Sequence, residues 1–473
     1  MSNGRARHPR TLIEVLQTRA ERQPDRPAYI VLPEDGGDPL TLTYGDVARR
    51  SLALATELRT VAAEGDRALL LYPPGADYVT AFFACLQAGL VAVPAYPPLQ
   101  PRLLARLETI VADAEATLAL TTSPFLSLAQ TTLDGAGRLA TLRWMTTDAM
   151  PGARPVERTM ATLGSEDPAF LQYTSGSTEQ ARGVTVTHAN LLDNLALIVE
   201  GFQLDADHVG VSWLPPYHDL GLIGGILVPL YAGFRCVLMS PLAFLRRPTL
   251  WLETITRYRG TISGGPNFAY DLCVRKVTPD ERGRLDLRSW AVACNAAEPV
   301  RADTLDRFAA TFVGCGFRRR AFSPCYGLAE ATLVVSGGRP AVAPTVATVE
   351  RASLEENRVV PAEAGGAATA LVACGRPLGT QQVAIVDPRT EQRCAPDAVG
   401  EIWVKGPSVT GGYWRRRDDT QRTFRAVTAD GDGPYLRTGD LGFLRDGELF
   451  VTGRLKAVIV SRGRNHYAHD IVV

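Results

Sequence analysis

The chain has 473 residues, 46% of them hydrophobic and 21% charged, a composition typical of a folded globular protein. Its 50 basic and 50 acidic side chains give a formal net charge of zero, so the charge balance favours neither nucleic acid nor an anionic membrane as a bulk partner. At about 100–200 residues per domain, the length predicts two to four domains or subdomains.

The N-terminal residues lack the apolar core of a secretory signal peptide. The most apolar window, Leu220 to Phe234, is broken by Gly and Pro and is shorter than the roughly 20 residues of a spanning helix. The 8 cysteines show no Cys-x-x-Cys spacing, which favours reduced thiols over disulfides or a structural metal. We therefore expect a cytoplasmic protein with no membrane insertion.

In chain order, a helix is expected over Leu12 to Ala20, then a strand, a turn and an amphipathic helix over Thr41 to Arg59. A helix over Asp77 to Ala88 ends at Gly89. Buried strands are expected at Arg67 to Tyr72, Leu90 to Tyr96, Thr117 to Thr122, Ala169 to Thr174, Val209 to Leu214, Arg235 to Ser240 and Trp290 to Asn295. Strands alternating with helices predict an α/β fold with largely parallel sheets, divided into subdomains at 1–185 and 186–374.

The pattern changes after Gly375. Short strands joined by Asp-Pro, Pro-Asp, Lys-Gly and Asp-Gly turns predict a small β-barrel-like subdomain over 375–455. Between the two patterns, Val335 to Gly366 has no clear period and several Pro and Gly, so we interpret it as a loop-rich insertion.

The stretch Leu171 to Val184, LQYTSGSTEQARGV, passes from an apolar strand into a cluster of Thr, Ser and Gly. Backbone N–H groups and hydroxyls of such a loop can surround phosphate oxygens, and loops at the carboxyl ends of parallel strands are where α/β sheets bind ligands. The loop is not a Walker motif, because no Gly-Lys-Ser/Thr closes it. Taken alone, it is equally compatible with an ordinary polar turn.

Further motifs follow this loop in a fixed order: Asn295-Ala-Ala-Glu298-Pro, Tyr326-Gly-Leu-Ala-Glu330, Arg437-Thr-Gly-Asp440 and Gly453-Arg454-Leu-Lys456. Together with Tyr173-Thr-Ser-Gly-Ser-Thr178 and Arg182-Gly183, they resemble the signature of the adenylate-forming superfamily across almost the whole chain. The resemblance implies an adenylate-forming N-terminal domain that uses ATP and Mg²⁺.

The resemblance also implies roles for individual residues. Thr174, Ser175, Gly176, Ser177 and Thr178 would bind phosphate. Asn295, Ala296, Ala297, Glu298, Tyr326, Gly327, Asp440 and Arg454 would bind the nucleotide. His218, Glu330 and Thr174 would be catalytic, with Glu330 holding the metal; for His218, a structural role in capping the next helix stays open.

Several phrases are similar to the fatty acyl-AMP ligase branch: Val93-Pro-Ala-Tyr-Pro-Pro98, Trp213-Leu-Pro-Pro-Tyr-His218, Ser263-Gly-Gly-Pro-Asn-Phe-Ala-Tyr270 and Arg462-Gly-Arg-Asn-His466. The irregular segment Val335 to Gly366 falls where that branch carries an insertion associated with disfavouring coenzyme A; a tolerated surface loop is the alternative. Trp213, Leu220, Gly221 and Phe268 would bind the acyl chain, although Trp213, Leu220 and Phe268 are also compatible with an ordinary core.

The implied function is activation of a fatty acid with ATP to a fatty acyl-adenylate, with transfer to an acyl carrier protein. The alternatives are an acyl-CoA synthetase, an amino-acid adenylation domain or a non-catalytic acyl-nucleotide-binding scaffold. Two positions depart from the family pattern: Ala296 replaces a common Gly, and Ala457 replaces the hinge Asp. We expect 456–473 to be the hinge and the start of a C-terminal domain that is absent from this chain and carries a late catalytic Lys.

Overall fold

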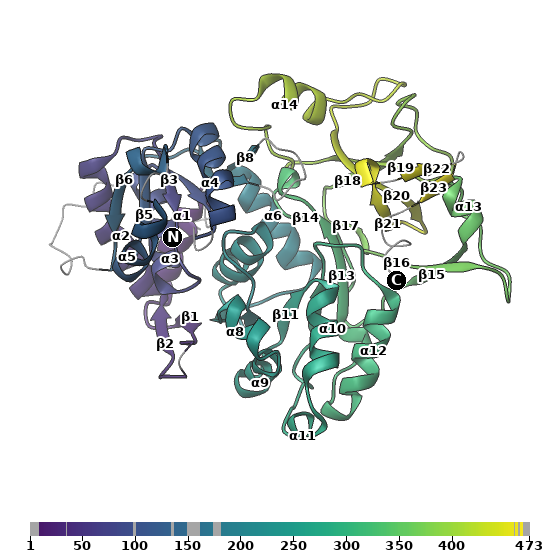
Figure 1. Ribbon diagram of the computed structural model, residues 1–473, viewed down its shortest axis with the longest axis horizontal. Helices are drawn as coiled ribbons and strands as arrows, with labels where there is room; N and C mark the ends of the chain where they lie inside the picture. The colour runs from purple at the N-terminus through teal and green to yellow at the C-terminus, as the bar shows by residue number, and fades with distance from the viewer. Residues whose placement is uncertain are drawn as a thin grey trace, which may run out of the picture. The chain divides into compact units, whose positions relative to one another are not determined.

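The computed structural model describes residues 9–34, 36–97, 101–133, 137–148, 161–173, 181–457, 459–461 and 464–466. The chain forms two compact units, each built from three segments. Figure 1 labels the helices and strands along the chain. Unit 1 contains Met1–Ala196, Leu214–Ser240 and Tyr413–Arg415, and unit 2 contains Leu197–Trp213, Pro241–Gly412 and Arg416–Val473. The four-part division expected from the sequence stays a prediction.

Unit 1 contains a six-stranded sheet in the order β6-β5-β3-β4-β7-β8. Its strands are β3 (Arg67–Leu70), β4 (Val91–Pro94), β5 (Leu118–Thr121), β6 (Arg143–Thr146), β7 (Pro168–Tyr173) and β8 (Gly183–Thr187). All neighbours are parallel except β7 and β8, which confirms the expected largely parallel sheet. Three further strands of this unit pair in the order β10-β1-β2: β10 (Arg235–Leu238), β1 (Pro27–Val31) and β2 (Leu40–Thr43).

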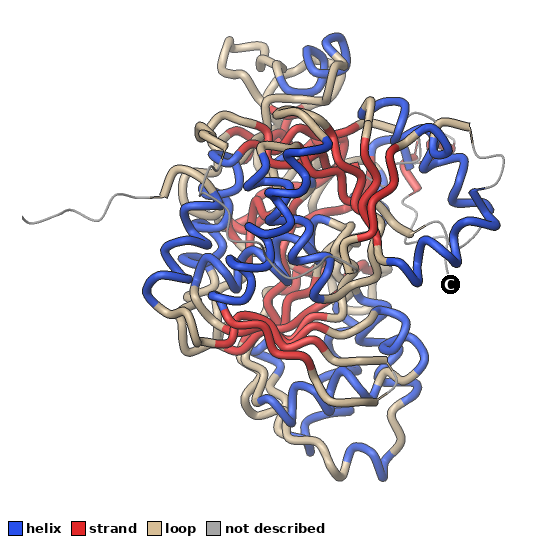
Figure 2. Tube along the Cα trace, turned by 90° about the vertical axis from the view of Figure 1, so that its left-hand side faces the viewer, coloured by secondary structure: helices blue, strands red, loops and turns tan. Residues whose placement is uncertain are grey.

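Helices accompany the strands of unit 1; Figure 2 colours the helices of the whole chain blue and its strands red. The helices of unit 1 are α1 (Leu12–Arg22), α2 (Tyr44–Val61), α3 (Ala76–Ala88), α4 (Pro101–Ala114), α5 (Ser123–Leu133), η1 (Leu139–Thr141), α6 (His188–Gly201, which continues into unit 2), the π-helix η2 (Leu220–Leu227) and α7 (Val228–Ala232). Helix α2 begins with a capping box, in which the Thr43 hydroxyl accepts from the Asp46 amide at 3.0 Å and the Asp46 carboxylate accepts from the Thr43 amide at 3.0 Å.

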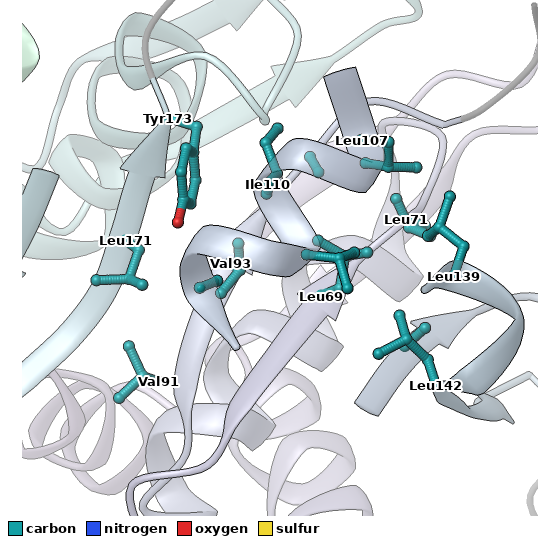
Figure 3. Packing of buried hydrophobic residues seen from close by; sticks show 14 of the residues in the cluster. Leu69, Leu71, Val91, Val93, Leu107, Ile110, Leu139, Leu142, Leu171 and Tyr173 are labelled. Atoms are coloured by element: carbon teal, nitrogen blue, oxygen red, sulfur yellow. The ribbon is translucent and has the colours of Figure 1, made fainter. Parts of the chain in front are cut away.

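The six-stranded sheet is covered on one face by an apolar cluster (Figure 3). Leu69, Val93 and Leu171 contribute from three neighbouring strands, while Leu107 and Ile110 contribute from α4. Every residue of β4 and β5 is buried, as expected for parallel strands that carry helices on both faces. This packing fixes the carboxyl end of β7, where the Thr/Ser/Gly stretch begins.

Unit 2 contains six strands in the order β17-β14-β13-β12-β11-β9. They are β9 (Val209–Ser212), β11 (Ile262–Gly265), β12 (Val292–Asn295), β13 (Phe322–Gly327), β14 (Val334–Gly337) and β17 (Arg376–Pro377). The strands from β9 to β13 are parallel, and β14 and β17 are antiparallel. The helices of this region are α8 (Pro241–Arg246), α9 (Thr249–Tyr258), α10 (Asn267–Lys276), α11 (Pro279–Arg282), α12 (Ala302–Phe312), η3 (Val313–Cys315), η4 (Arg319–Ala321) and η5 (Ala329–Ala331).

The β-rich end of unit 2 corrects one expectation. Strands β18 (Gln382–Val386), β19 (Gly400–Lys405), β20 (Leu436–Arg445) and β21 (Glu448–Arg454) form an open antiparallel sheet in sequence order, so no barrel closes among the described residues. The two edge strands, β18 and β21, do not pair with each other. The remaining elements are α14 (Arg417–Phe424), η6 (Leu455–Ala457), β22 (Ile459–Ser461) and β23 (Arg464–His466).

The segment Val335 to Gly366 is more regular than the sequence suggested. It includes strand β15 (Val346–Glu350) and helix α13 (Arg351–Glu355), and β15 pairs along its length with β16 (Ala368–Val372). The elements are short, which explains why no period was visible. Val349 and Leu354 pack with Phe443 and Phe450 of the four-stranded sheet, so this segment has its own apolar anchor.

No helix within the described ranges is long and apolar enough to cross a membrane.

Candidate functional site

A buried carboxylate lies at the centre of the polar site in unit 2. Asp440 on β20 is 6% exposed, accepts a hydrogen bond from the Tyr326 hydroxyl at 2.8 Å and accepts one from Arg454 Nε at 3.0 Å. Burial raises the pKa of the Asp440 carboxyl, and the nearby Arg454 guanidinium and the Tyr326 hydrogen bond oppose that rise. The structure thus brings together three of the predicted nucleotide-binding residues.

The local fold explains this convergence. Asp440 and Arg454 face each other as partners on the adjacent strands β20 and β21, and Tyr326 is the second-last residue of β13. Burial raises the pKa of the Tyr326 phenol well above its ordinary value, so at neutral pH it stays a neutral hydrogen-bond donor. A carboxylate has about four lone-pair positions, and two bonds leave acceptor capacity at Asp440.

Glu401 is a supporting residue that the sequence reasoning missed. Its buried carboxylate accepts hydrogen bonds from Arg437 Nε at 3.0 Å and Nη2 at 2.8 Å, and from the Gly439 amide at 3.1 Å. Gly439 has a φ of +71°, which glycine adopts without steric cost. The sequence contained a signal, because Glu401 is an acidic residue directly before the apolar run Ile402 to Val404 of strand β19.

Glu330 lies in the short helix η5, on the connection between β13 and β14. Its backbone carbonyl accepts from the Thr410 amide at 2.9 Å. Asp440 first, and Glu330 more weakly, raise the pKa of the Arg454 guanidinium, so both carboxylates act on the same cation. Gly327, which begins this connection, must be glycine, because a Cβ there would lie 1.7 Å from the Leu333 carbonyl oxygen.

The donor set does not form a complete metal cage. Within the described ranges, no group of three or more His, Cys, Asp or Glu side chains could hold a metal ion. A single carboxylate such as Glu330 suits Mg²⁺, which keeps several waters and commonly binds through one or two carboxylates together with substrate phosphates.

The Asn295–Glu298 segment has a more structural character than expected. The Asn295 side chain is fully buried, and its amide donates to Asn267 Oδ1 at 3.1 Å, which ties β12 to α10. Ala297 has a φ of +72°, an uncommon value for a residue with a side chain. Glu298 accepts a hydrogen bond from the Phe268 amide at 3.1 Å, and Ala296 is buried.

In unit 1, His218 is held beside the end of β7. The Gln172 side chain donates to the Tyr217 carbonyl at 3.1 Å, and the Tyr78 hydroxyl donates to the Pro216 carbonyl at 2.7 Å. His218 Nδ1 lies 2.6 Å from Asp219 Oδ1. Burial lowers the pKa of the His218 imidazole, but the charge and the hydrogen bond of Asp219 together outweigh it and leave the pKa raised.

Thr174, Ser175, Gly176, Ser177 and Thr178 lie outside the described residues, but the residues that flank them are fixed. Before the loop, the Tyr173 hydroxyl donates to Asp113 at 2.9 Å. After it, the Arg182 guanidinium lies 5.5 Å from the centre of the Tyr413 ring. The Trp414 amide also donates to the Gly183 carbonyl at 2.7 Å. A distant segment of the chain therefore holds the exit of the loop.

The four predicted acyl-binding residues divide between the units. In unit 2, Trp213 stacks on Phe244 at 4.1 Å between ring centres and meets Phe268 edge-to-face at 6.0 Å. Trp213 is 3% exposed and Phe268 is 44% exposed, so one is a core ring and the other faces solvent. In unit 1, Leu220 begins η2, and a Cβ at Gly221 would lie 2.1 Å from the Pro215 carbonyl oxygen.

Comparison with known proteins places these observations in context. Residues 16–414 match the family described as AMP-binding enzyme. The chain is 46% identical to the medium-chain fatty acid–acyl carrier protein ligase JamA of Moorena producens, over 98% of this chain and 79% of that protein. It is 38% identical to the long-chain fatty acid–AMP ligase FadD23 of Mycobacterium tuberculosis, over 91% and 75%.

A solved structure of a fatty acyl-adenylate ligase is also similar to this chain. The fatty acyl-adenylate ligase of L. pneumophila, in complex with acyl adenylate and pyrophosphate, superposes with a TM-score of 0.87 at 40% identity. The match covers 94% of this chain and 77% of that one.

Proposed function

The chain belongs to the AMP-binding enzyme family, in its fatty acyl-AMP ligase branch, and from that premise we propose that it activates a fatty acid with ATP. A carboxylate oxygen of the fatty acid attacks the α-phosphorus, and the bond from that phosphorus to the bridging oxygen of pyrophosphate breaks. The products are a fatty acyl-adenylate and pyrophosphate. The observation that carries the proposal is the buried Asp440 with its Tyr326 and Arg454 partners.

This polar network suits the nucleoside part of ATP. The remaining lone pairs of Asp440 accept hydrogen bonds from the ribose hydroxyls, and Arg454 holds the carboxylate in place. The Tyr326 ring offers a face for the purine, while its hydroxyl fixes the ring through Asp440. Backbone groups around Ala297 complete the adenine contacts. Because these groups are arranged before the nucleotide arrives, little reorganisation is needed.

The phosphate end of ATP falls to other residues. Hydroxyls and amides of Thr174 to Thr178 hold the leaving pyrophosphate, a role that rests on the family resemblance. His218, whose pKa Asp219 raises, donates a hydrogen bond from a ring N–H to the negative charge that develops on the α-phosphate oxygens. Glu330 would hold Mg²⁺, which would supply charge neutralisation at the phosphate oxygens.

We further propose that the acyl group passes to the phosphopantetheine thiol of an acyl carrier protein. This is the acceptor class in the name of JamA, with which the chain shares 46% identity. The exposed Phe268 ring beside Trp213 is the proposed contact for the alkyl chain in unit 2. All eight cysteines are free thiols, which supports a reducing, cytoplasmic setting.

Calorimetric binding of non-hydrolysable acyl-AMP analogues tests the proposal. We expect a dodecanoyl analogue to bind far more tightly than acetyl or aminoacyl analogues, and Asp440→Ala to weaken all three equally. Tighter binding of the aminoacyl analogue would instead indicate an amino-acid adenylation domain. If none of the three binds, the polar network in unit 2 is not a nucleotide site.

A further inference from the structure

The connection that carries Glu330 contains a strained residue. Thr332 has φ +69° and ψ −62°, and the Leu333 amide donates to the Ala331 carbonyl at 2.9 Å. These values define a γ-turn of the positive-φ kind, which is rare and strained. A β-branched residue with positive φ is a genuine outlier, because its side chain crowds the backbone. Glycine would adopt the same turn without that cost.

Two hydrogen bonds hold the connection in this shape. The Thr332 hydroxyl donates to the Ser408 carbonyl at 2.6 Å, and the Thr410 amide donates to the Glu330 carbonyl at 2.9 Å. Thr332 is 1% exposed, and Ser408 is fully buried. The segment after β19 therefore grips the connection on both sides of Ala331.

The ends of the connection are fixed as well. Gly327 pairs with Val334 across β13 and β14, and the close approach of the Leu333 carbonyl to Gly327 leaves no slack. Because both ends and the middle of the connection are held, the backbone angles at Thr332 determine where Glu330 lies. Strain of this kind persists only where the surroundings over-determine it, and it is concentrated at functional sites.

We propose that Thr332 is a positioning residue: its strained turn, tied to Ser408, holds the Glu330 carboxylate at the place where it meets the Mg²⁺ of Mg·ATP. The inference rests on the proposed function and adds a residue to it. Thr332 itself touches neither metal nor nucleotide. Its effect therefore belongs to the metal-dependent part of ATP binding and not to the nucleoside contacts of Asp440.

Three substitutions at Thr332 separate the effect of its hydroxyl from the effect of its backbone strain. Thr332→Val keeps the branched shape but removes the hydroxyl, so the Ser408 carbonyl loses its donor. Thr332→Ser keeps the hydroxyl. Thr332→Gly removes both the strain and the tether, so it gives a folded variant even if Thr332→Val is unstable. Thr428→Val is the matched control, because Thr428 is also buried and donates its hydroxyl to a carbonyl, that of Asp432, at 3.0 Å.

The measurement is calorimetric affinity for a non-hydrolysable ATP analogue, with Mg²⁺ and with EDTA, beside thermal unfolding of each variant. We expect Thr332→Val and Thr332→Gly to weaken binding about tenfold in Mg²⁺, the effect of losing one buried hydrogen bond, and to leave binding in EDTA unchanged. Thr332→Ser and Thr428→Val should bind as the unaltered protein does.

Equal weakening with Mg²⁺ and with EDTA would overturn the inference, because it would indicate general damage to the site. Unchanged affinity in both Thr332→Gly and any folded Thr332→Val would overturn it too. If the unaltered chain binds the analogue in neither condition, the proposed function itself fails, and that result is distinct from the other two.

Discussion

The two ends of strand β13 are held in place by different means. At the amino end, Phe322 lies in a cluster of rings, 5.3 Å from Tyr270, 5.0 Å from Phe317 and 5.9 Å from Phe308 between ring centres. At the carboxyl end, the Tyr326 hydroxyl donates a hydrogen bond to Asp440 at 2.8 Å, and the chain then enters the strained connection.

The difference separates stability from function along one strand. Each ring in the cluster has several partners, so the position of any one is over-determined by packing, and loss of one leaves a cavity. The polar end depends on single, directional bonds that contribute little net stability but fix atoms in place. Substitutions at the amino end should therefore lower stability, and substitutions at the carboxyl end should lower activity.

The largest effect is expected at the ring cluster. Phe308 is fully buried and contacts five other rings, so Phe308→Ala should reduce the free energy of unfolding by about 4 kcal/mol. Urea denaturation measures the change. The fraction of Phe308→Ala that remains folded should keep the KM for ATP of the unaltered protein. A decrease in the free energy of unfolding below about 1 kcal/mol would show that the ring cluster contributes little to stability.

The next effect is expected at the polar end. Asp440→Asn removes the charge that accepts from Tyr326 and Arg454, and kcat/KM for ATP should fall about 100-fold, equivalent to about 3 kcal/mol. Unfolding should change by less than about 1 kcal/mol, because the Arg454 side chain is 67% exposed and can be rehydrated. Asp397→Asn, which breaks an exposed ion pair with Arg445, is the control. If Asp440→Asn lost much stability but kept full activity, Asp440 would have a structural role and not a functional one.

His188 tests whether buried polar groups in this chain always mark function. It is fully buried, its Nδ1 accepts from the Leu12 amide at 3.3 Å, and burial lowers its pKa to about 4. The unfolded chain, with an ordinary pKa near 6.5, binds the proton first, so stability is full above about pH 6.5 and falls by about 3 kcal/mol as the pH drops to about 4.

Denaturation across that pH range measures this slope. His188→Gln, whose amide does not take up a proton, should flatten it between pH 6.5 and 4. An unchanged slope would assign the acid sensitivity to other groups, and a changed KM for ATP at pH 7 would give His188 a role beyond structure.

The smallest effect is expected at Arg182, which follows the proposed phosphate loop. Tyr413→Leu removes the ring under Arg182, a contact of about 1 kcal/mol, and should raise the KM for ATP about fivefold. Tyr413→Phe keeps the ring and should behave as the unaltered protein. Phe443→Leu, which removes a buried ring under Arg445, should lower stability without changing this KM. Equal KM values in all three variants would separate Arg182 from the reaction.

The sequence predicted most helices and strands of this fold, because hydrophobic periodicity and turn residues are signals that lie within each segment. It predicted a β-barrel-like end where an open sheet stands, since closure depends on which strands meet and not on what each strand contains. Two elements of the segment Val335 to Gly366 were missed for a related reason: β15 and α13 are too short to show a period.

The site was predictable where a motif names the residue and hidden where a distant segment supports it. Tyr326, Asp440 and Arg454, which three separate motifs name, contact one another in the structure, and their binding of a nucleotide stays a prediction. Glu401 and Thr332 were missed, because their importance lies in contacts with residues far along the chain, or in a backbone angle that no local pattern encodes.

The segmented build of unit 1 has a consequence for how the protein is made. Strand β8 is an edge of the six-stranded sheet, and Tyr413 bridges to it at Val184, while Trp414 packs against the apolar cluster of the same sheet. A ribosome therefore releases most of unit 1 early but delivers its last strand neighbour only after residue 415 has emerged. During that interval the growing chain carries an unprotected sheet edge. Fragments that stop before residue 413 should accordingly recruit chaperones or aggregate, even though they contain most residues of unit 1.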